Sequence, residues 1–129
     1  MKVNGLDGKT YAWTWSSGST ENCSEPHRLA KTLLRKIYTV ESIYEEVQLP
    51  GSYGLIADFY LPQKQMIVEV HGKQHYKFIP HFHVTYLGFL AHKKRDQNKR
   101  QWCEINNISY VELPDNEGLD EWTRRILDR

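Results

Sequence analysis

The sequence has few cysteines, no long apolar run and almost no net charge. Its 129 residues include only Cys23 and Cys103, which form no CxxC pair. This excludes a disulfide-stapled scaffold and a cysteine zinc knuckle, so we expect both thiols to be reduced. No segment approaches the roughly 18 consecutive apolar residues of a membrane-spanning helix, and the N-terminus lacks the apolar stretch of a signal peptide. We therefore expect a cytoplasmic protein with no membrane partner.

Positive charge is concentrated in one segment rather than spread over the chain. Seventeen Lys and Arg residues nearly balance sixteen Asp and Glu residues, giving a net charge of +1. The run from residue 92 to 100 nevertheless carries one acid, Asp96, among five cations: Lys93, Lys94, Arg95, Lys99 and Arg100. Such a run could neutralise several DNA phosphates. The alternative is a solvated helix face on which Asp96 pairs with Arg100 one turn later.

The apolar pattern predicts one α/β domain. Ser24 is a candidate N-cap for an amphipathic helix of about four turns. The apolar spacing within residues 119–129 predicts a last amphipathic helix. Strand-like runs at 43–49, 55–60 and 66–71 predict an antiparallel meander. A helix in one or two pieces within 84–106, with Leu87, Leu90, Ala91, Trp102 and Ile105 on its apolar face, then leads to a strand at 108–113. A strand that follows a crossover helix lies parallel to its neighbour, so we expect a mixed sheet flanked by helices.

The N-terminal segment contains an aromatic alternation. Tyr11, Trp13 and Trp15 are separated by Ala12 and Thr14, a period of two that predicts a strand. Packing in the core is the favoured role of these rings. The alternative is that they insert into a mismatch or a junction in DNA, where aromatic side chains replace base stacking.

The hairpin between residues 55 and 71 carries the most specific pattern. If residues 62–65 form the connection, the residue numbers of each antiparallel pair add up to 127. Asp58 then faces Glu69. One face is then wholly apolar and must be the core face, with Leu55, Ala57, Phe59, Leu61, Met66, Val68 and Val70. The other face displays Ile56, Asp58, Tyr60, Ile67, Glu69 and His71. Directly opposed carboxylates repel each other, so a shared proton or a bound divalent cation must compensate. Paired carboxylates suit Mg²⁺ or Mn²⁺, and hydrated acids at a sheet edge are the alternative.

Several basic side chains follow Glu69 closely. His71 lies on the same strand face, and Lys73 and His75 come soon after. An imidazole near neutral pH relays protons, and an ammonium group stabilises developing negative charge. We therefore expect His71, Lys73 or His75 to position a water molecule on the metal. A histidine-rich zinc site that also uses His81 and His83 is the weaker alternative.

The order of these motifs resembles the PD-(D/E)XK nuclease superfamily. The run DFYLPQKQMIVEVHGKQHY is similar to the very-short-patch repair (Vsr) nucleases and the EDxHD homing endonucleases, and SEPHRLAKTLL followed by YEEVQLP and DFYLP is similar to a phage Holliday junction resolving endonuclease. The resemblance implies a restriction-endonuclease-like core in which Asp58 and Glu69 bind metal. It also implies that Glu25 assists through water or a second ion, and that Asp96 orients a histidine. His71 replaces the lysine of the superfamily.

These observations predict a Mg²⁺- or Mn²⁺-dependent DNA endonuclease, of bacterial or phage origin. Residues 1–23 would form an N-terminal strand or arm, 24–113 the catalytic core, and 114–129 the C-terminal helix. The basic run would contact phosphates near the scissile bond. A domain this small needs a homodimer, a partner protein or recognition of DNA shape for specificity. A junction-resolving nuclease and an inactive DNA-binding module are the alternatives.

Overall fold

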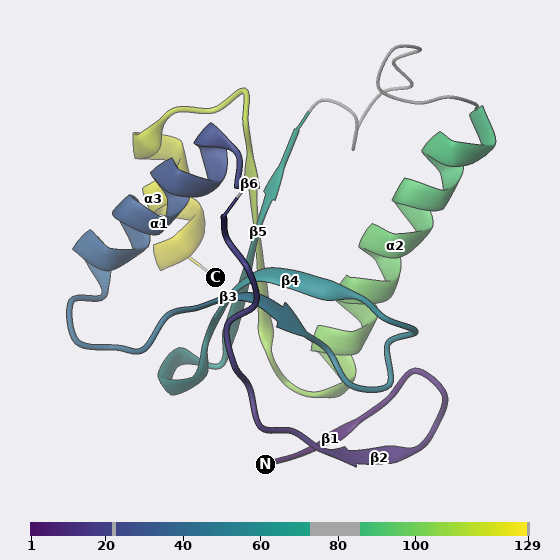
Figure 1. Cartoon of the computed structure of the whole chain (residues 1–129). Helices are drawn as coiled ribbons and strands as arrows, with labels where there is room; N and C mark the ends of the chain where they lie inside the picture. The colour runs from purple at the N-terminus through teal and green to yellow at the C-terminus, as the bar shows by residue number, and fades with distance from the viewer. Residues whose placement is uncertain (22, 73–85, 129) are drawn as a thin grey trace.

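A computed structural model describes residues 1–21, 23–72 and 86–128 (Figure 1). Its elements follow the order β1 (Lys2–Asn4), β2 (Thr10–Ala12), α1 (Glu25–Ile37), β3 (Tyr44–Gln48), β4 (Ile56–Leu61), a 3₁₀ turn η1 (Pro62–Lys64), β5 (Met66–His71), α2 (Tyr86–Ile105), β6 (Ser109–Pro114) and α3 (Leu119–Leu127). None of the described helices combines the length and apolar character needed to cross a bilayer.

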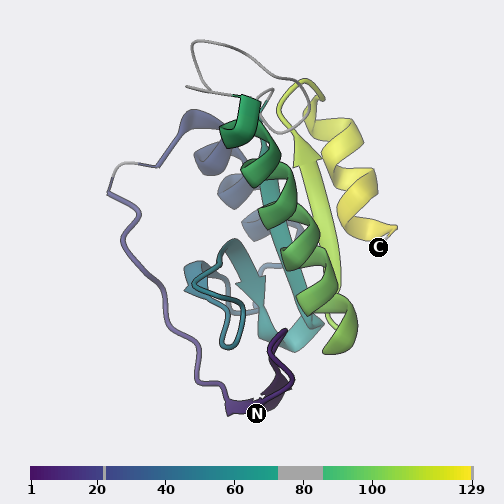
Figure 2. The ribbon, with the colours of Figure 1, turned by 90° about the vertical axis from the view of Figure 1, so that its right-hand side faces the viewer.

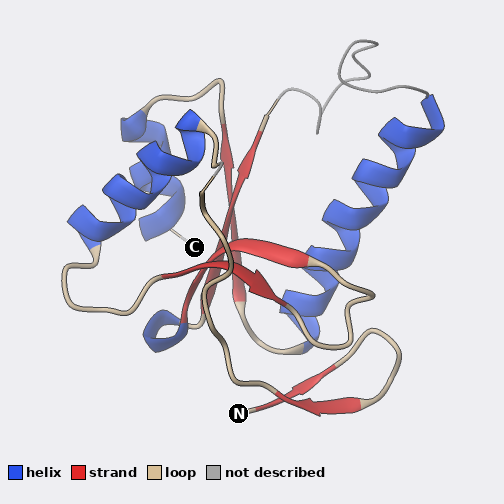
Figure 3. Cartoon of the chain, viewed as in Figure 1, coloured by secondary structure: helices blue, strands red, loops and turns tan. Residues whose placement is uncertain are grey.

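The central sheet has the strand order β3-β4-β5-β6. The first three strands form the expected antiparallel meander, and β6 pairs in parallel with β5 after the α2 crossover. Figure 3 shows this mixed sheet between its helices. The mixed α/β architecture predicted from the sequence is therefore confirmed.

The two faces of the sheet are covered by different helices, as Figures 1 and 2 show. On one face, α1 and α3 place Leu34, Trp122 and Ile126 against Phe59 and Val68. On the other face, α2 places Trp102 and Cys103 against Tyr60 and Ile67. Each helix buries only one stripe of apolar residues, so its charged residues remain available for solvent or for a site.

Helix α1 begins where the sequence predicts. The Ser24 hydroxyl accepts a hydrogen bond from the backbone N–H of His27 at 3.3 Å, and Pro26 occupies the first turn. Such an N-cap satisfies one of the helix's unpaired amide groups. The cap fixes the position of the first turn, which carries both Glu25 and His27.

The predicted register of the β4–β5 hairpin is confirmed. Phe59 pairs with Val68, Tyr60 with Ile67 and Leu61 with Met66, so the partners sum to 127 as expected. Beyond Phe59 the strands no longer pair. Leu55 and Ala57 were expected on the face of Phe59, but they join the opposite core with Trp13 and Val47. Since β4 is released from β5 at this point, its N-terminal half turns toward the other layer.

The aromatic strand predicted for residues 11–15 is wrong beyond Ala12. Strand β2 ends there, and Trp13 leaves the hairpin because its ring enters the core. That ring lies 4.6 Å from the ring of Tyr60 and 5.2 Å from that of Trp102, and its Nε1 donates to the Gln48 carbonyl at 3.2 Å. The packing role is therefore confirmed for Trp13. Both cysteines are free thiols, as expected.

Of the residues predicted for the apolar face within 84–106, only Trp102 is buried, and Ile105 in the same C-terminal half is exposed by 40%. Helix α2 is one continuous helix, and Trp102 is fully buried. Leu87 and Leu90, by contrast, are exposed by 76% and 44%. In Figure 1 the N-terminal half of α2 slants away from β5 and β6, so its side chains do not pack on the sheet as Trp102 does.

Replacing Trp102 by Ala tests the α2 core. The indole is fully buried, and its Nε1 donates to the Pro50 carbonyl at 2.8 Å, so we expect a loss of about 3–5 kcal/mol in the free energy of unfolding. Leu87→Ala, in the exposed half of the same helix, should change it by less than about 0.5 kcal/mol. Urea denaturation followed by circular dichroism measures both. Equal effects would contradict the placement of α2.

Candidate functional site

The candidate site lies where strands β4 and β5 separate. The carboxylates of Asp58 and Glu69 replace the missing backbone pairing there: Glu69 Oε2 accepts from the Asp58 backbone N–H at 2.6 Å, and Asp58 Oδ2 accepts from the Val70 N–H at 2.8 Å. The two acids that the sequence places opposite each other are therefore brought together. Glu69 thus holds the backbone of Asp58, and Asp58 holds the backbone of Val70, the residue after Glu69.

Glu69 has a cationic partner that the sequence analysis assigned elsewhere. Lys99 of α2 donates to Glu69 Oε1, and the two side chains are exposed by only 17% and 2%. Burial and the neighbouring Asp58 raise the pKa of Glu69, an effect that Lys99 opposes. Burial also lowers the pKa of Lys99, but Glu69 and Asp58 raise it by more, so its ammonium group stays charged. Lys99 therefore supplies part of the compensation expected from a proton or a metal, and the pKa of Glu69 remains raised, to about 8.

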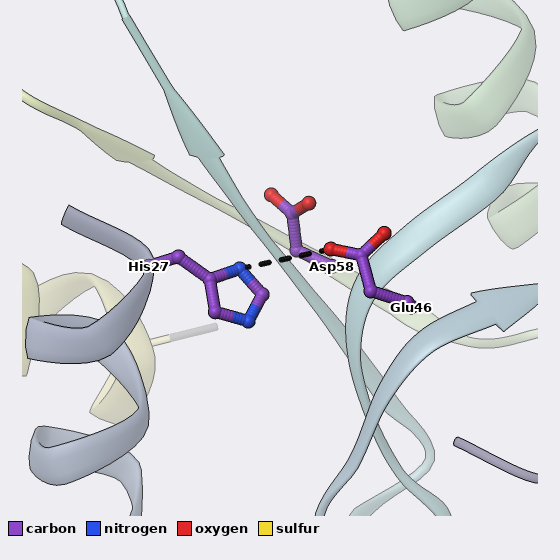
Figure 4. A group of neighbouring side chains, drawn as sticks. All are labelled: His27, Glu46 and Asp58. Atoms are coloured by element: carbon purple, nitrogen blue, oxygen red, sulfur yellow. Dashed lines mark ion pairs between the residues drawn. The ribbon is translucent and has the colours of Figure 1, made fainter. Parts of the chain in front are cut away.

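A second group of side chains surrounds Asp58 from the other side. His27 of α1, Glu46 of β3 and Asp58 of β4 each offer one ligand atom, and these atoms lie within 4.8 Å of one another (Figure 4). Ligand atoms bound to one ion at about 2.0–2.2 Å are at most about 4.4 Å apart. Only one pair among three ligands can lie on opposite sides of the ion, so side-chain shifts of about one ångström would bring these three residues around a divalent cation.

The orientation of His27 suits a metal ligand. Its Nε2 lies 3.0 Å from Glu45 Oε1, and its Nδ1 lies 3.9 Å from Glu46 Oε1. Burial alone would raise the pKa of Glu45, but hydrogen bonds from Lys31 and His27 lower it overall, so Glu45 is ionised and accepts the Nε2 proton. In the tautomer that carries its proton on Nε2, the Nδ1 lone pair is directed toward Glu46. A carboxylate that holds the other ring nitrogen is the usual support of a metal-binding histidine.

The electrostatics of Glu46 also favour a cation. Burial and the neighbouring Asp58 raise its pKa, because the ionised form is poorly solvated and repelled. Among the described residues, Glu46 is also one of four non-glycine residues with a positive φ, at +52°. This backbone conformation is uncommon for residues with a side chain and clusters at functional sites.

The other predicted site residues are dispersed. Glu25 is exposed at the start of α1 and pairs with Arg28 at 3.7 Å. His71 is buried, with Nδ1 at 3.1 Å from Glu112 Oε1 and Nε2 at 3.2 Å from the Tyr110 hydroxyl, so both ring nitrogens face protein groups. Asp96 is buried in α2. Lys73, His75, His81 and His83 lie outside the described residues, and their roles stay predictions.

The basic run does not form one continuous DNA-facing surface. Lys94 and Arg95 are exposed, and Lys93 is half-buried with its Nζ 5.9 Å from the ring centre of Phe89. Lys99 turns inward to Glu69, whereas Arg100 pairs with Glu112 of β6 rather than with Asp96 as the solvated-face alternative expected. Three of the five predicted phosphate contacts therefore remain on the outer part of α2.

Three residues of the site were missed or misassigned from the sequence: His27, Glu46 and Lys99. Lys99 precedes the buried Trp102 and Cys103 by three and four positions, and this spacing places it on the core face of a helix. His27 follows Glu25 by two positions, about 200° around the helix, so the two residues cannot face the same way. These spacings could have identified both residues.

The Lys99→Met substitution tests the buried ion pair. It leaves the carboxylate of Glu69 without its cation in a site excluded from water, and we expect a loss of about 3 kcal/mol in unfolding free energy. The double variant Lys99→Met/Glu69→Gln should recover most of that loss, since no unpaired charge remains. Urea denaturation of the four proteins in this cycle measures the coupling. Additive losses would contradict the pairing.

The comparisons with known proteins give sequence relatives but no family. The chain is 44% identical over 64 residues to uncharacterized protein 307L of Invertebrate iridescent virus 6, a match that covers 50% of this chain and 32% of that protein. It is 35% identical over 61 residues to uncharacterized protein 033L of Invertebrate iridescent virus 3, covering 47% and 31%. The chain thus spans about a third of each relative. No family model and no solved structure matches it.

Proposed function

We propose that this protein is a metal-dependent DNA endonuclease of the PD-(D/E)XK type. The observation that carries the proposal is the convergence of five side chains from five elements at the separation of β4 from β5: His27, Glu46, Asp58, Glu69 and Lys99. The predicted and observed position of Asp58 against Glu69 supports the resemblance seen in the sequence. The two relatives belong to viruses of invertebrates, which supports a viral origin in place of a bacterial or phage one.

The donor set fits a divalent cation. His27, Glu46 and Asp58 would hold the ion, with Glu69 beside them. A bound divalent ion lowers the pKa of a coordinated water and polarises a phosphate oxygen. Two carboxylates suit Mg²⁺ and Mn²⁺ alike, whereas an imidazole ligand is better suited to Mn²⁺ than to Mg²⁺. We therefore place Mn²⁺ ahead of Mg²⁺ as the activating ion.

The side chains around the ion have separate tasks. Glu45 holds His27 through Nε2, so that Nδ1 would be available to bind the ion. Lys99 brings a positive charge to Glu69, where it can orient an attacking water and offset the charge that develops on phosphate. Lys93, Lys94 and Arg95 lie farther toward the N-terminus of α2, where they can contact the phosphates of a DNA backbone. His71, held by Tyr110 and Glu112, is better suited to a positioning role than to activating water.

Cleavage should depend on Asp58. Asp58→Asn removes a charged ligand, and we expect plasmid nicking in Mn²⁺ to fall at least about 100-fold. Asp120→Asn, on the first turn of α3, removes a carboxylate outside the site and should cleave at the wild-type rate. Gel analysis of supercoiled plasmid measures both. Full activity of Asp58→Asn would exclude the mechanism, and DNA binding without cleavage by the wild-type protein would favour an inactive DNA-binding module.

Metal affinity should depend on His27 and on its support by Glu45. We expect His27→Ala to abolish tight Mn²⁺ binding and Glu45→Gln to weaken it about 10- to 100-fold, because the imidazole loses its charged partner. Glu25→Gln removes the residue that the sequence suggested and should leave binding unchanged. Isothermal titration calorimetry with MnCl₂ compares the three variants. If Glu25→Gln weakens binding and His27→Ala does not, the ligand set proposed here is wrong.

A further inference from the structure

A surface groove of about 540 Å³ adjoins the candidate metal site. One wall is the extended segment 12–19 between β2 and α1, and the other consists of residues from β3, β4 and the loop that joins them. Glu46 lines this groove and also belongs to the cluster with His27 and Asp58. If a DNA phosphate binds at the proposed metal, a molecule in the groove would lie directly beside that phosphate.

Backbone and side-chain hydrogen bonds hold the wall of the groove in place. The Gly18 N–H donates to the Glu45 carbonyl at 2.9 Å, and the Glu45 N–H donates to the Ser17 hydroxyl at 3.0 Å. A Cβ atom on Gly18 would lie 2.7 Å from the carbonyl oxygen of Glu46, so only glycine allows this close approach. These contacts fix the outer wall of the groove against β3.

The lining chemistry favours an uncharged, planar and polar group. The outer wall offers the hydroxyls of Thr14, Ser16 and Ser19 beside the indole of Trp15. No Lys, Arg or His occurs among the lining residues of the described chain, and Glu46 is the one charged residue among them. A phosphate would find no cation there. A nucleobase, by contrast, stacks on an aromatic ring and exchanges hydrogen bonds with hydroxyls.

We propose that this groove receives one unpaired nucleobase of the DNA strand whose phosphate lies at the metal. This inference rests on the proposed function and specifies its substrate class: single-stranded DNA, or a duplex with an extrahelical nucleotide. In a regular duplex, each base is stacked and paired and cannot enter the groove without the cost of flipping. A base that is already unpaired avoids this cost, so the groove selects for it.

A binding experiment on a cleavage-deficient protein tests the groove. The Asp58→Asn protein, without metal, is titrated into a duplex that carries a single bulged 2-aminopurine and into the matched duplex. We expect about tenfold tighter binding of the bulged duplex, since stacking of one base contributes about 1–3 kcal/mol. The fluorescence of 2-aminopurine should fall as the base stacks on Trp15. Equal affinities for the two duplexes would overturn the proposal.

Substitutions in the same background locate the effect. Trp15→Ala should remove the preference and the quenching, whereas Trp15→Phe should retain part of both. Tyr53→Ala, an exposed aromatic outside the groove lining, is the matched control and should retain them fully. Because Trp15 also contacts Trp13 and Tyr60, Ser16→Trp provides an independent test: it fills the groove from an exposed position and should abolish the preference in a folded protein. Retention of the preference in Ser16→Trp would refute the assignment.

The two proposals fail in different ways. If the wild-type protein with Mn²⁺ cleaves bulged and matched duplexes equally well, and Trp15→Phe and Ser16→Trp do the same, the groove assignment is wrong and the nuclease stands. If the wild-type protein cleaves neither duplex, while the Asp58→Asn protein still binds the bulge preferentially through Trp15, the groove stands and the nuclease is wrong.

Discussion

The separation of β4 from β5 after the Phe59–Val68 pair is the constraint on which the site depends. Two backbone N–H groups would lose their sheet partners at this point, and the carboxylates of Asp58 and Glu69 accept from them instead. A buried amide without a partner is costly, so the two acids support the fold as well as the candidate chemistry. The same separation lets side chains from α1 and α2 approach the acids from opposite sides of the sheet.

Like charges gathered in one place need counter-charges, and the chain supplies them unevenly. Lys99 lies against Glu69, and Lys31 and His27 lie against Glu45. For Glu46, burial and repulsion by Asp58 are only partly offset, and its pKa is raised. A divalent cation is the simplest species that would balance the charge there, and this imbalance distinguishes the site from an ordinary buried ion pair.

The fold was largely predictable from the sequence because strand alternation is a strict constraint. A four-residue connection at 62–65 places every apolar side chain of the paired strands on consistent faces, and a shift of one residue would reverse all of them. That argument fixed the position of Asp58 relative to Glu69. It failed for Leu55 and Ala57, because alternation holds only while the strands remain paired, and no residue pattern marks where pairing ends.

The site was predicted less completely, because its members meet only through tertiary packing. His27 becomes a candidate ligand when α1 packs on the sheet, where its ring stacks on that of Phe59 in β4 at 4.3 Å. Glu46 depends on a backbone conformation with positive φ that its neighbours in sequence do not require. Lys99 belongs to a run whose composition is typical of a DNA-binding surface, and only its helical spacing to Trp102 shows that it faces inward.

The contact between Gly18 and Glu45 has a consequence for the solution behaviour of the protein. Strand β3 is at the margin of the sheet, and an uncovered margin offers unpaired amide and carbonyl groups to any other extended chain. Residues 17 and 18 occupy two of these groups on β3. Detachment of this segment would therefore open a site for self-association, and the same few hydrogen bonds that shape the groove also help to keep the molecules apart.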